Sequence, residues 1–186
     1  MKEVLQSHIS LSESLYQVFL DASKKLEAKK GEILFFPQQG NKRILFIEKG
    51  LLRGYKIIDG KDYTHHFYTE NWFATDFESF LTNQSGQLYI EAMTDVSYYE
   101  FQKETLLQLY RSHHELERLG RIIAEKAFLA TVQKLTDIQT LDLKSRYQQL
   151  ILKNQELFLK VPQKYIASYL GVSEQSLSRI KNSLIS

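Results

Sequence analysis

The chain has 186 residues, of which 43% are hydrophobic, and its 24 lysines and arginines nearly balance 22 aspartates and glutamates. That composition is enough for the core of one large or two small globular domains. The absence of cysteine excludes disulfides, thiolate zinc sites and cysteine-ligated iron–sulfur clusters. No apolar run approaches the roughly 18 to 20 residues of a membrane helix, and the first residues have no signal-type stretch, so we expect a soluble, cytoplasmic protein without a membrane partner.

The first predicted element is a short amphipathic helix over residues 10–25. Ser12 and Glu13 are placed to cap its start and to complement its dipole. Apolar residues recur at helical spacing within it: Leu15, Val18, Phe19 and Ala22.

From residue 28 on, the hydrophobic period changes to that of β-strands. Asp59-Gly60 between two apolar runs is a strong hairpin signal. Many short strands with no long helix between them predict an antiparallel sandwich or barrel, not a parallel α/β sheet. The runs are rich in β-branched and aromatic residues and cover residues 29–36, 43–48, 51–58, 63–69, 87–92 and 96–101.

After residue 101 the pattern is helical, with predicted helices over 103–110, 113–136 and 141–153 and a short strand over 157–161. The long helix has more than one apolar face. One reading is that a face meets a second copy of the chain, and the other is that the helix packs only on its own β-roll. The seam expected for a homodimer consists of Leu116, Leu119, Ile123, Ala127 and Ala130.

Residues 163–182 indicate two helices joined by a tight turn. Apolar residues recur at helical spacing on both sides of Gly171, which can adopt the positive φ that such a turn requires. Ser173 is placed to cap the second helix, whose free face carries polar side chains suited to base edges and phosphates. A helix-turn-helix that reads DNA is therefore the first hypothesis, and an ordinary helical hairpin is the alternative.

The charge distribution favours the first hypothesis. Residues 150–186 hold five lysines and arginines against two glutamates, a net charge of +3 in a chain whose total is +2. The positive charge therefore lies where DNA phosphates would have to be neutralised.

Four motifs in this order resemble the Crp/Fnr superfamily of bacterial transcription regulators over essentially the whole chain. They are KKGEILFF at 29–36, IEKGLLRGY at 47–55, DGKDYTHHFYTENWF at 59–73 and, most specific, VPQKYIASYLGVSEQSLSRIKNSL at 161–184. The resemblance implies an α+β fold with an N-terminal antiparallel β-roll of the cyclic-nucleotide-binding type, a long dimerisation helix and a C-terminal helix-turn-helix domain. The expected domain boundaries are 1–112, 113–140 and 141–186.

The resemblance also implies partners and contact residues. The expected partners are double-stranded DNA, a second copy of the chain and RNA polymerase. Arg179 is the best candidate for bidentate recognition of guanine, and Glu174 departs from the cation often found at its position. The expected DNA-binding residues are Ser173, Glu174, Gln175, Ser176, Ser178, Arg179 and Lys164.

The sequence departs from the family pattern in two further respects, at its C-terminal end and at the expected phosphate site. Only six residues follow Ile180, so we expect the two-stranded wing that commonly follows the recognition helix in this family to be missing. The strand at 157–161 would then lack a partner, and the DNA-binding module would be more mobile than usual. Members that bind cyclic nucleotides hold the phosphate with a Gly-Glu pair and an Arg ten residues later. Here the alignment gives Thr75-Asp76 and Gly86, which removes the cation and disfavours cyclic AMP at the usual site.

The sequence leaves the effector unidentified and implies no cofactor. Its expected pocket consists of Arg53, Trp72, Thr75, Asp76, Gly86 and Tyr89. One alternative is a regulator that responds to cyclic nucleotides through a non-standard phosphate site, since Arg53 and Lys56 could reach in from another direction. A remote alternative is a cupin-like metalloenzyme with His65 and His66, but adjacent strand residues point to opposite faces. We therefore expect no metal site and no enzymatic activity.

Overall fold

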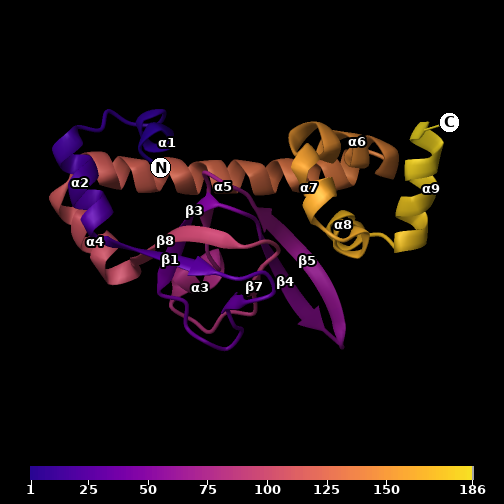
Figure 1. Cartoon of the computed structure of the whole chain (residues 1–186), viewed down its shortest axis with the longest axis horizontal. Helices are drawn as coiled ribbons and strands as arrows, with labels where there is room; N and C mark the ends of the chain where they lie inside the picture. Colours follow the sequence, from indigo (N-terminus) through magenta and orange to yellow (C-terminus); the bar gives the residue numbers. More distant parts are fainter. Residues whose placement is uncertain (186) are drawn as a thin grey trace. The chain divides into compact units, whose positions relative to one another are not determined.

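The computed structural model of the chain describes residues 1–185 (Figure 1). The chain divides into two compact units. The first unit comprises Met1–Gly54 and Phe67–Ala127, and the second comprises Tyr55–His66 and the residues from Phe128 onward. The second unit therefore combines the tip of a hairpin from the middle of the sequence with the helices of the C-terminal third.

In residues 1–185, eight strands form two four-stranded sheets, and the pairings described between them are antiparallel. One sheet has the order β1 (Ser23–Ala28), β8 (Val96–Gln102), β3 (Arg43–Lys49), β6 (Phe73–Ala74). The other has the order β2 (Ile33–Phe35), β7 (Tyr89–Ala92), β4 (Leu52–Ile58), β5 (Lys61–Tyr68). With the helices, this architecture confirms the predicted α+β class and its antiparallel β-roll.

Strand β3 is buried on both faces, because alternate side chains enter two different cores. Leu45 and Ile47 belong to the core that the two sheets share, whereas Ile44 and Phe46 point into a second core. Helices of the first unit supply much of the rest of that second core: α1 (Lys2–Gln6), α2 (Glu13–Asp21), α4 (Lys103–Ser112) and the first half of α5 (His114–Thr140). Figure 1 shows α2 and α4 beside the N-terminal end of α5.

The predicted helix over 10–25 is right at its start and wrong at its end. The backbone N–H of Leu15 donates to the Ser12 Oγ at 3.2 Å, which is the expected cap, but α2 ends at Asp21 and Ser23 begins strand β1. Strand β1 pairs with β8 in continuous register from Ser23 opposite Phe101 to Ala28 opposite Val96. This pairing with a distant segment overrides the local helical pattern. The run predicted as the first strand, 29–36, contains only the short β2.

The predicted hairpin at Asp59-Gly60 is confirmed between β4 and β5. Both turn residues have positive φ, 50° at Asp59 and 73° at Gly60. Two consecutive positive φ values define the type I′ turn, whose twist matches that of the flanking strands.

The second unit contains four helices after α5: α6 (Leu143–Lys153), α7 (Gln155–Lys160), α8 (Gln163–Leu170) and α9 (Glu174–Ile185). The strand predicted over 157–161 is wrong, because α7 occupies it. Leu157 is buried, Phe158 lies edge-on to Tyr147 with ring centroids 5.4 Å apart, and Glu156 pairs with Lys160 at 2.6 Å across one helical turn. Because this segment is a helix, the mobility expected from an unpaired strand loses its basis.

Helix α9 continues to Ile185. Within residues 1–185, no helix is long and apolar enough to cross a membrane.

Candidate nucleic-acid interface and β-roll cavity

A helix-turn-helix forms at the predicted place. Gly171 ends α8 in the left-handed conformation, with φ 73° and ψ 31°. Its N–H donates to the Ser168 carbonyl, and the Val172 N–H donates to the Ala167 carbonyl, each at 3.0 Å. These bonds satisfy carbonyls that the end of a helix leaves open. A glycine therefore sets the angle between the two helices.

The second helix of this motif has a side-chain cap. The backbone N–H of Ser176 donates to the Ser173 Oγ at 3.2 Å, and the two hydroxyl oxygens lie 3.0 Å apart. The apolar residues Ile166, Ala167 and Leu170 of α8 and Leu177 of α9 are buried. Burial on one face fixes which residues of α9 remain on the other.

The predicted DNA-contact residues lie on that remaining face. Ser173, Glu174, Gln175, Ser178 and Arg179 are exposed, whereas Ser176 is half-buried because it takes part in the cap. Lys164 at the start of α8 is also exposed, with its Nζ 4.7 Å from the centre of the Tyr165 ring. Among residues 1–185, no carboxylate forms an ion pair with Arg179.

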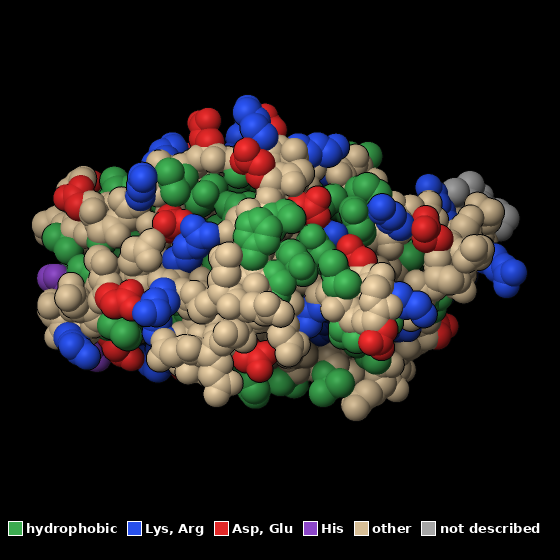
Figure 2. All heavy atoms as spheres, turned by 90° about the horizontal axis from the view of Figure 1, so that it is seen from below, with side chains coloured by type: hydrophobic (Ala, Val, Ile, Leu, Met, Phe, Trp, Pro, Cys, Tyr) green, Lys and Arg blue, Asp and Glu red, His purple; other side chains and the backbone are tan. Residues whose placement is uncertain are grey.

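Basic and acidic side chains alternate over the face seen in Figure 2, in keeping with the small net charge of the whole chain. Over the described residues, this face therefore shows no broad basic patch that would attract an anionic polymer such as DNA. Affinity for DNA would have to come from the local excess of cations near α8 and α9.

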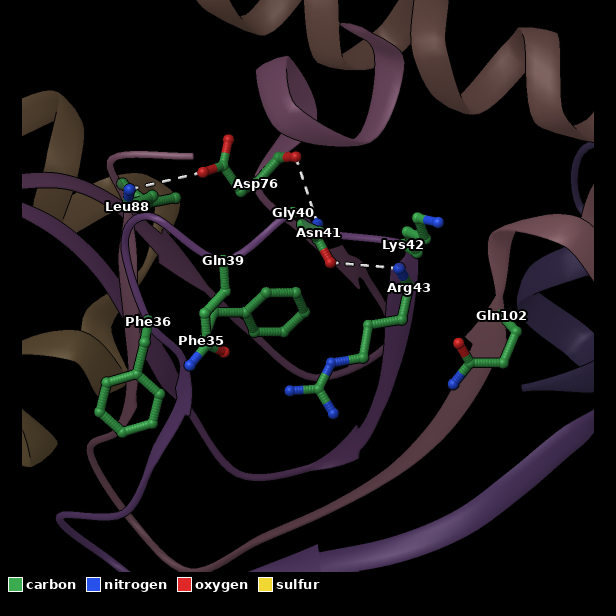
Figure 3. Close-up of a pocket in the computed structure, with 10 residues that line it drawn as sticks. All are labelled: Phe35, Phe36, Gln39, Gly40, Asn41, Lys42, Arg43, Asp76, Leu88 and Gln102. Atoms are coloured by element: carbon green, nitrogen blue, oxygen red, sulfur yellow. Dashed lines mark hydrogen bonds between the residues drawn. The ribbon is translucent and has the colours of Figure 1, made fainter. Parts of the chain in front are cut away.

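A cavity of about 190 Å³ opens in the β-roll, and we call it the β-roll cavity (Figure 3). Arg43 extends from β3 toward the Phe35 ring, with its guanidinium carbon 4.7 Å from the ring centre. The Arg43 Nη1 also pairs with the Glu100 Oε2 at 2.7 Å, and its Nη2 donates to the Leu34 carbonyl. The lining residues are Phe35, Phe36, Gln39, Gly40, Asn41, Lys42, Arg43, Asp76, Leu88 and Gln102.

The carboxylate of Asp76 caps helix α3 (Phe77–Thr82). Its Oδ1 accepts from the Ser79 N–H at 3.2 Å and its Oδ2 from the Leu88 N–H at 3.4 Å. A Cβ at Gly86 would lie 2.1 Å from the same Oδ2. A carboxylate of the protein thus takes the amide donors that an incoming anion would need.

Of the six residues expected in an effector pocket, only Asp76 lines this cavity. Thr75 is buried, and its hydroxyl donates to the Arg43 carbonyl at 2.9 Å. Arg53 is 1% exposed on β4, where its Nη2 pairs with Glu91 of β7 at 3.1 Å. Tyr89 lies edge-on to Phe36 at 6.3 Å, and the Trp72 carbonyl accepts from the Ile47 N–H at 2.9 Å.

The sequence reading missed Lys42 and Arg43, the two cations of the cavity. The available signal was a pair of adjacent basic residues at the start of a strand. The pair could not be assigned to the cavity because the connection from β2 to β3 folds back against α3, where the Asn41 N–H donates to the Ser79 Oγ at 2.9 Å.

The two histidines behind the metalloenzyme alternative differ in environment. His65 is exposed, whereas His66 is half-buried, and burial together with the nearby Lys134 and His65 lowers the pKa of His66 to about 4. Residues 1–185 contain no group of three or more His, Asp or Glu side chains placed to hold a metal ion.

The residues expected to form a dimer seam separate into two groups along α5. Leu116, Leu119 and Ile123 are 0%, 2% and 8% exposed, because they belong to the helical core of the first unit. These three side chains therefore pack against the core of their own chain, as the second of the two interpretations expects. Ala127 is half-buried and Ala130 is exposed. Large exposed apolar side chains begin one residue after Ala127, and they are Phe128, Leu129, Val132, Leu135 and Ile138.

Comparison with known proteins agrees with this fold. The family of the cyclic nucleotide-binding domain matches residues 25–113. FixK2 from Bradyrhizobium japonicum superposes with a TM-score of 0.76 at 16% identity, covering 87% of this chain and 84% of its own. A protein from Eubacterium rectale described as a transcriptional regulator of the Crp/Fnr family gives 0.70 at 18% identity, covering 91% and 82%. The chain has the Crp/Fnr fold.

A third Crp/Fnr-like structure is the c-di-GMP responsive global regulator CLP of Xanthomonas campestris, with a TM-score of 0.69 at 16% identity over 93% of this chain and 91% of its own. No curated protein sequence matches the chain. The family match covers the β-roll cavity but stops before α8 and α9, whereas the FixK2 and CLP structures cover 87% and 93% of this chain. The helix-turn-helix is therefore supported by fold and by its own geometry.

Proposed function

We propose that the chain is a DNA-binding transcription regulator of the Crp/Fnr type and not an enzyme. The observation that carries the proposal is the pair α8 and α9, joined by left-handed Gly171 and followed by a capped helix with a polar, exposed face. A helix presented in this way fits the major groove of B-DNA. In this role the protein acts in the cytoplasm, with RNA polymerase as the partner that the family resemblance implies.

The proposed contacts differ in what they read. Arg179 offers two parallel donors to the O6 and N7 atoms of guanine, and Glu174 can accept from the amino group of cytosine. Ser173, Gln175 and Ser178 are placed for base edges or phosphates, and Ser176 contributes mainly through the cap. Lys164 lies at the start of α8, where the helix dipole and a cation both favour a phosphate.

We further propose a homodimer through the second half of α5. Phe128, Val132 and Leu135 follow one another at i, i+4 and i+7 and are 67%, 42% and 56% exposed. An apolar stripe on a helix is ordinarily covered, and a second copy of the same helix covers it symmetrically. Two helix-turn-helix motifs related in this way would read an inverted repeat with half-sites about one DNA turn apart.

For the effector, we propose that the β-roll does not bind cyclic AMP or cyclic GMP in the usual way of this fold. Asp76 already holds the amide donors, and Gly86 supplies no cation. The family match over residues 25–113 favours a second candidate, a regulator that binds a cyclic nucleotide against Lys42 and Arg43. The β-roll cavity of about 190 Å³ is below the range of roughly 300 to 1,000 Å³ typical of ligand pockets, which counts against this candidate.

Selection from a pool of random duplexes, with the full chain at a fixed low salt concentration, tests the proposal. An enriched inverted repeat supports both DNA reading and the dimer. An enriched single half-site supports DNA reading alone. If the recovered pool has no motif although the protein is folded, the proposed function is wrong.

A further inference from the structure

A second, larger cavity of about 450 Å³ lies wholly within the second unit, and we call it the α6 cavity. Residues of β5, α5, α6 and α8 line it, so it is bounded by the hairpin, the long helix and the first helix of the helix-turn-helix. Its volume is in the range of small-molecule sites. It contains none of the residues of the β-roll cavity.

The charged residues of the lining are mainly cationic. Lys134, Arg146 and Lys153 contribute three positive charges against one carboxylate, Asp137, whose Oδ1 accepts from the Gln133 Nε2 at 2.7 Å. Positive charges in a partly desolvated site attract an anionic ligand far more strongly than the same charges on an open surface would. The charge balance therefore selects for an anion.

Arg146 has donors to offer such an anion. Its Nη1 donates to the Leu170 carbonyl at 3.1 Å, which orients the guanidinium beside the C-terminal end of α8. Its Nε is buried and has no hydrogen-bond partner within the described chain. A buried donor left without a partner costs free energy, and an anionic ligand that accepted from it would remove that cost.

Lys134 is fixed at the junction of three elements. Its Nζ donates to the His65 carbonyl of β5 at 2.9 Å and lies 3.9 Å from the centre of the Tyr169 ring of α8. Burial lowers the pKa of Lys134 to about 8. A bound anion would favour the charged form of this amine, so anion binding and protonation of Lys134 would support each other.

The lining also has a large apolar part, formed by Ala130, Leu135, Ile138, Leu150, Leu170 and Tyr169, beside the polar residues His65, His66, Thr131, Gln133 and Gln149. A fully polar anion such as inorganic phosphate would leave the apolar part of the lining without an apolar partner. A ligand with an apolar body and one charged end would cover it and also reach the cations.

We propose that the α6 cavity binds a small amphiphilic organic anion, a carboxylate carried on an apolar chain or ring. The carboxylate lies at Arg146, with Lys134 and Lys153 adding to the local positive charge. The apolar body lies along Ala130, Leu150 and Leu170.

This site is distinct from the proposed dimer surface, as the helical positions of α5 show. At 100° per residue, Phe128, Val132 and Leu135 fall within about 60° of one another, whereas Ala130, Lys134 and Asp137 centre on the opposite half of the helix. Ile138 lies at the boundary between the two faces, and Leu135 belongs to the dimer stripe although it also lines one side of the cavity. A second copy could therefore cover one face while the α6 cavity stays open.

Titration calorimetry of the full chain with octanoate, in the absence of DNA, tests the site, and 1-octanol serves as the neutral ligand of the same length. We expect octanoate to bind at one site per chain and more tightly than 1-octanol. Arg146→Met should weaken octanoate binding at least about tenfold and leave 1-octanol unchanged, and Arg146→Lys should restore part of the loss. Lys144→Gln removes an exposed cation of the same helix outside the cavity and should change neither affinity.

Ala130→Trp fills the cavity from α5 and should abolish binding of both ligands, with circular dichroism verifying that each variant is folded. The proposal is overturned if octanoate binds no more tightly than 1-octanol, or if Ala130→Trp binds octanoate as the unaltered chain does. Whether octanoate also changes DNA affinity rests on the proposed function, because α8 belongs to the helix-turn-helix. Calorimetry without DNA supports or overturns the site even if the chain does not bind DNA.

Discussion

The Asp76 carboxylate and Gly86 lie so close that any Cβ at position 86 would come within 2.1 Å of the Asp76 Oδ2. The same carboxylate caps α3 through the Ser79 N–H and accepts from the Leu88 N–H. The two residues therefore constrain each other, because the glycine leaves room for a carboxylate that holds the loop. An arginine at position 86 is incompatible with Asp76 in this position, so replacing Gly86 alone would not restore a phosphate site.

The pair should behave as a coupled unit in stability measurements. We expect Gly86→Ala to destabilise the first unit by about 1 to 3 kcal/mol, since a methyl group cannot fit without moving Asp76. Asp76→Ala should cost about 1 kcal/mol through the lost cap. The double variant should cost clearly less than the sum, which urea unfolding of all four chains measures as a double-mutant cycle. Gly40→Ala is the control, because a Cβ there would meet no atom within 4 Å.

Cyclic nucleotides should not bind. A phosphodiester in the β-roll cavity would face the Asp76 carboxylate, and the Arg43 guanidinium is already shared among Glu100, Leu34 and the Phe35 ring. We expect no measurable heat when cyclic AMP or cyclic GMP is titrated into the full chain. A micromolar dissociation constant that Arg43→Gln weakens would instead favour the second candidate function.

A charge introduced into the exposed apolar stripe of α5, formed by Phe128, Val132 and Leu135, should dissociate the proposed dimer. Val132→Glu introduces a carboxylate into the stripe that it shares with Phe128, and sedimentation should show monomers with the thermal unfolding of the first unit unchanged. Gln133→Glu adds the same charge on another face and should leave the dimer intact. Ile123→Glu should act differently and destabilise the first unit, because Ile123 lies in its core. A dimer that survives Val132→Glu would exclude this surface as the interface.

Acid should weaken the second unit through His66. Its pKa is about 4 in the folded chain, against an ordinary value of 6.5, so between these values the unfolded state binds more protons. Stability therefore rises with pH across this window and is lost as pH falls from 6.5 to 4, by on the order of 2 kcal/mol. NMR of the His66 imidazole should show titration near pH 4, and His66→Gln should flatten the stability profile. A titration midpoint near 6.5 would contradict the burial of this ring.

The features that the sequence predicted correctly depend on neighbours in the chain. Gly171 and Ser173 specify a turn and a cap within a few residues, and Asp59-Gly60 specifies a type I′ hairpin by backbone preference alone. Asp76 was identified by alignment to a family motif, and in the structure its side chain caps α3.

The features that the sequence reading missed or misassigned depend on distant parts of the chain. Strand β1 has the sequence SKKLEA, which forms a strand because β8 is available to pair with it. Residues 157–160 are apolar over too short a run to distinguish strand from helix, and packing of Leu157 and Phe158 decides for α7. The same limit applies to α5, since periodicity cannot tell whether Ile123 meets its own core or a second chain.

The proposed function depends most on sequence-specific DNA binding by α9, and the affinity of Arg179→Ala for the selected duplex tests this directly. At one fixed salt concentration, we expect the variant to bind the operator about 1 to 3 kcal/mol more weakly, with discrimination lost at one base pair per half-site and binding to a scrambled duplex little changed. Lys144→Gln, which removes one positive charge from another helix of the second unit, should bind as the unaltered chain does. Equal losses on operator and scrambled duplex, or no loss for Arg179→Ala, would contradict the account.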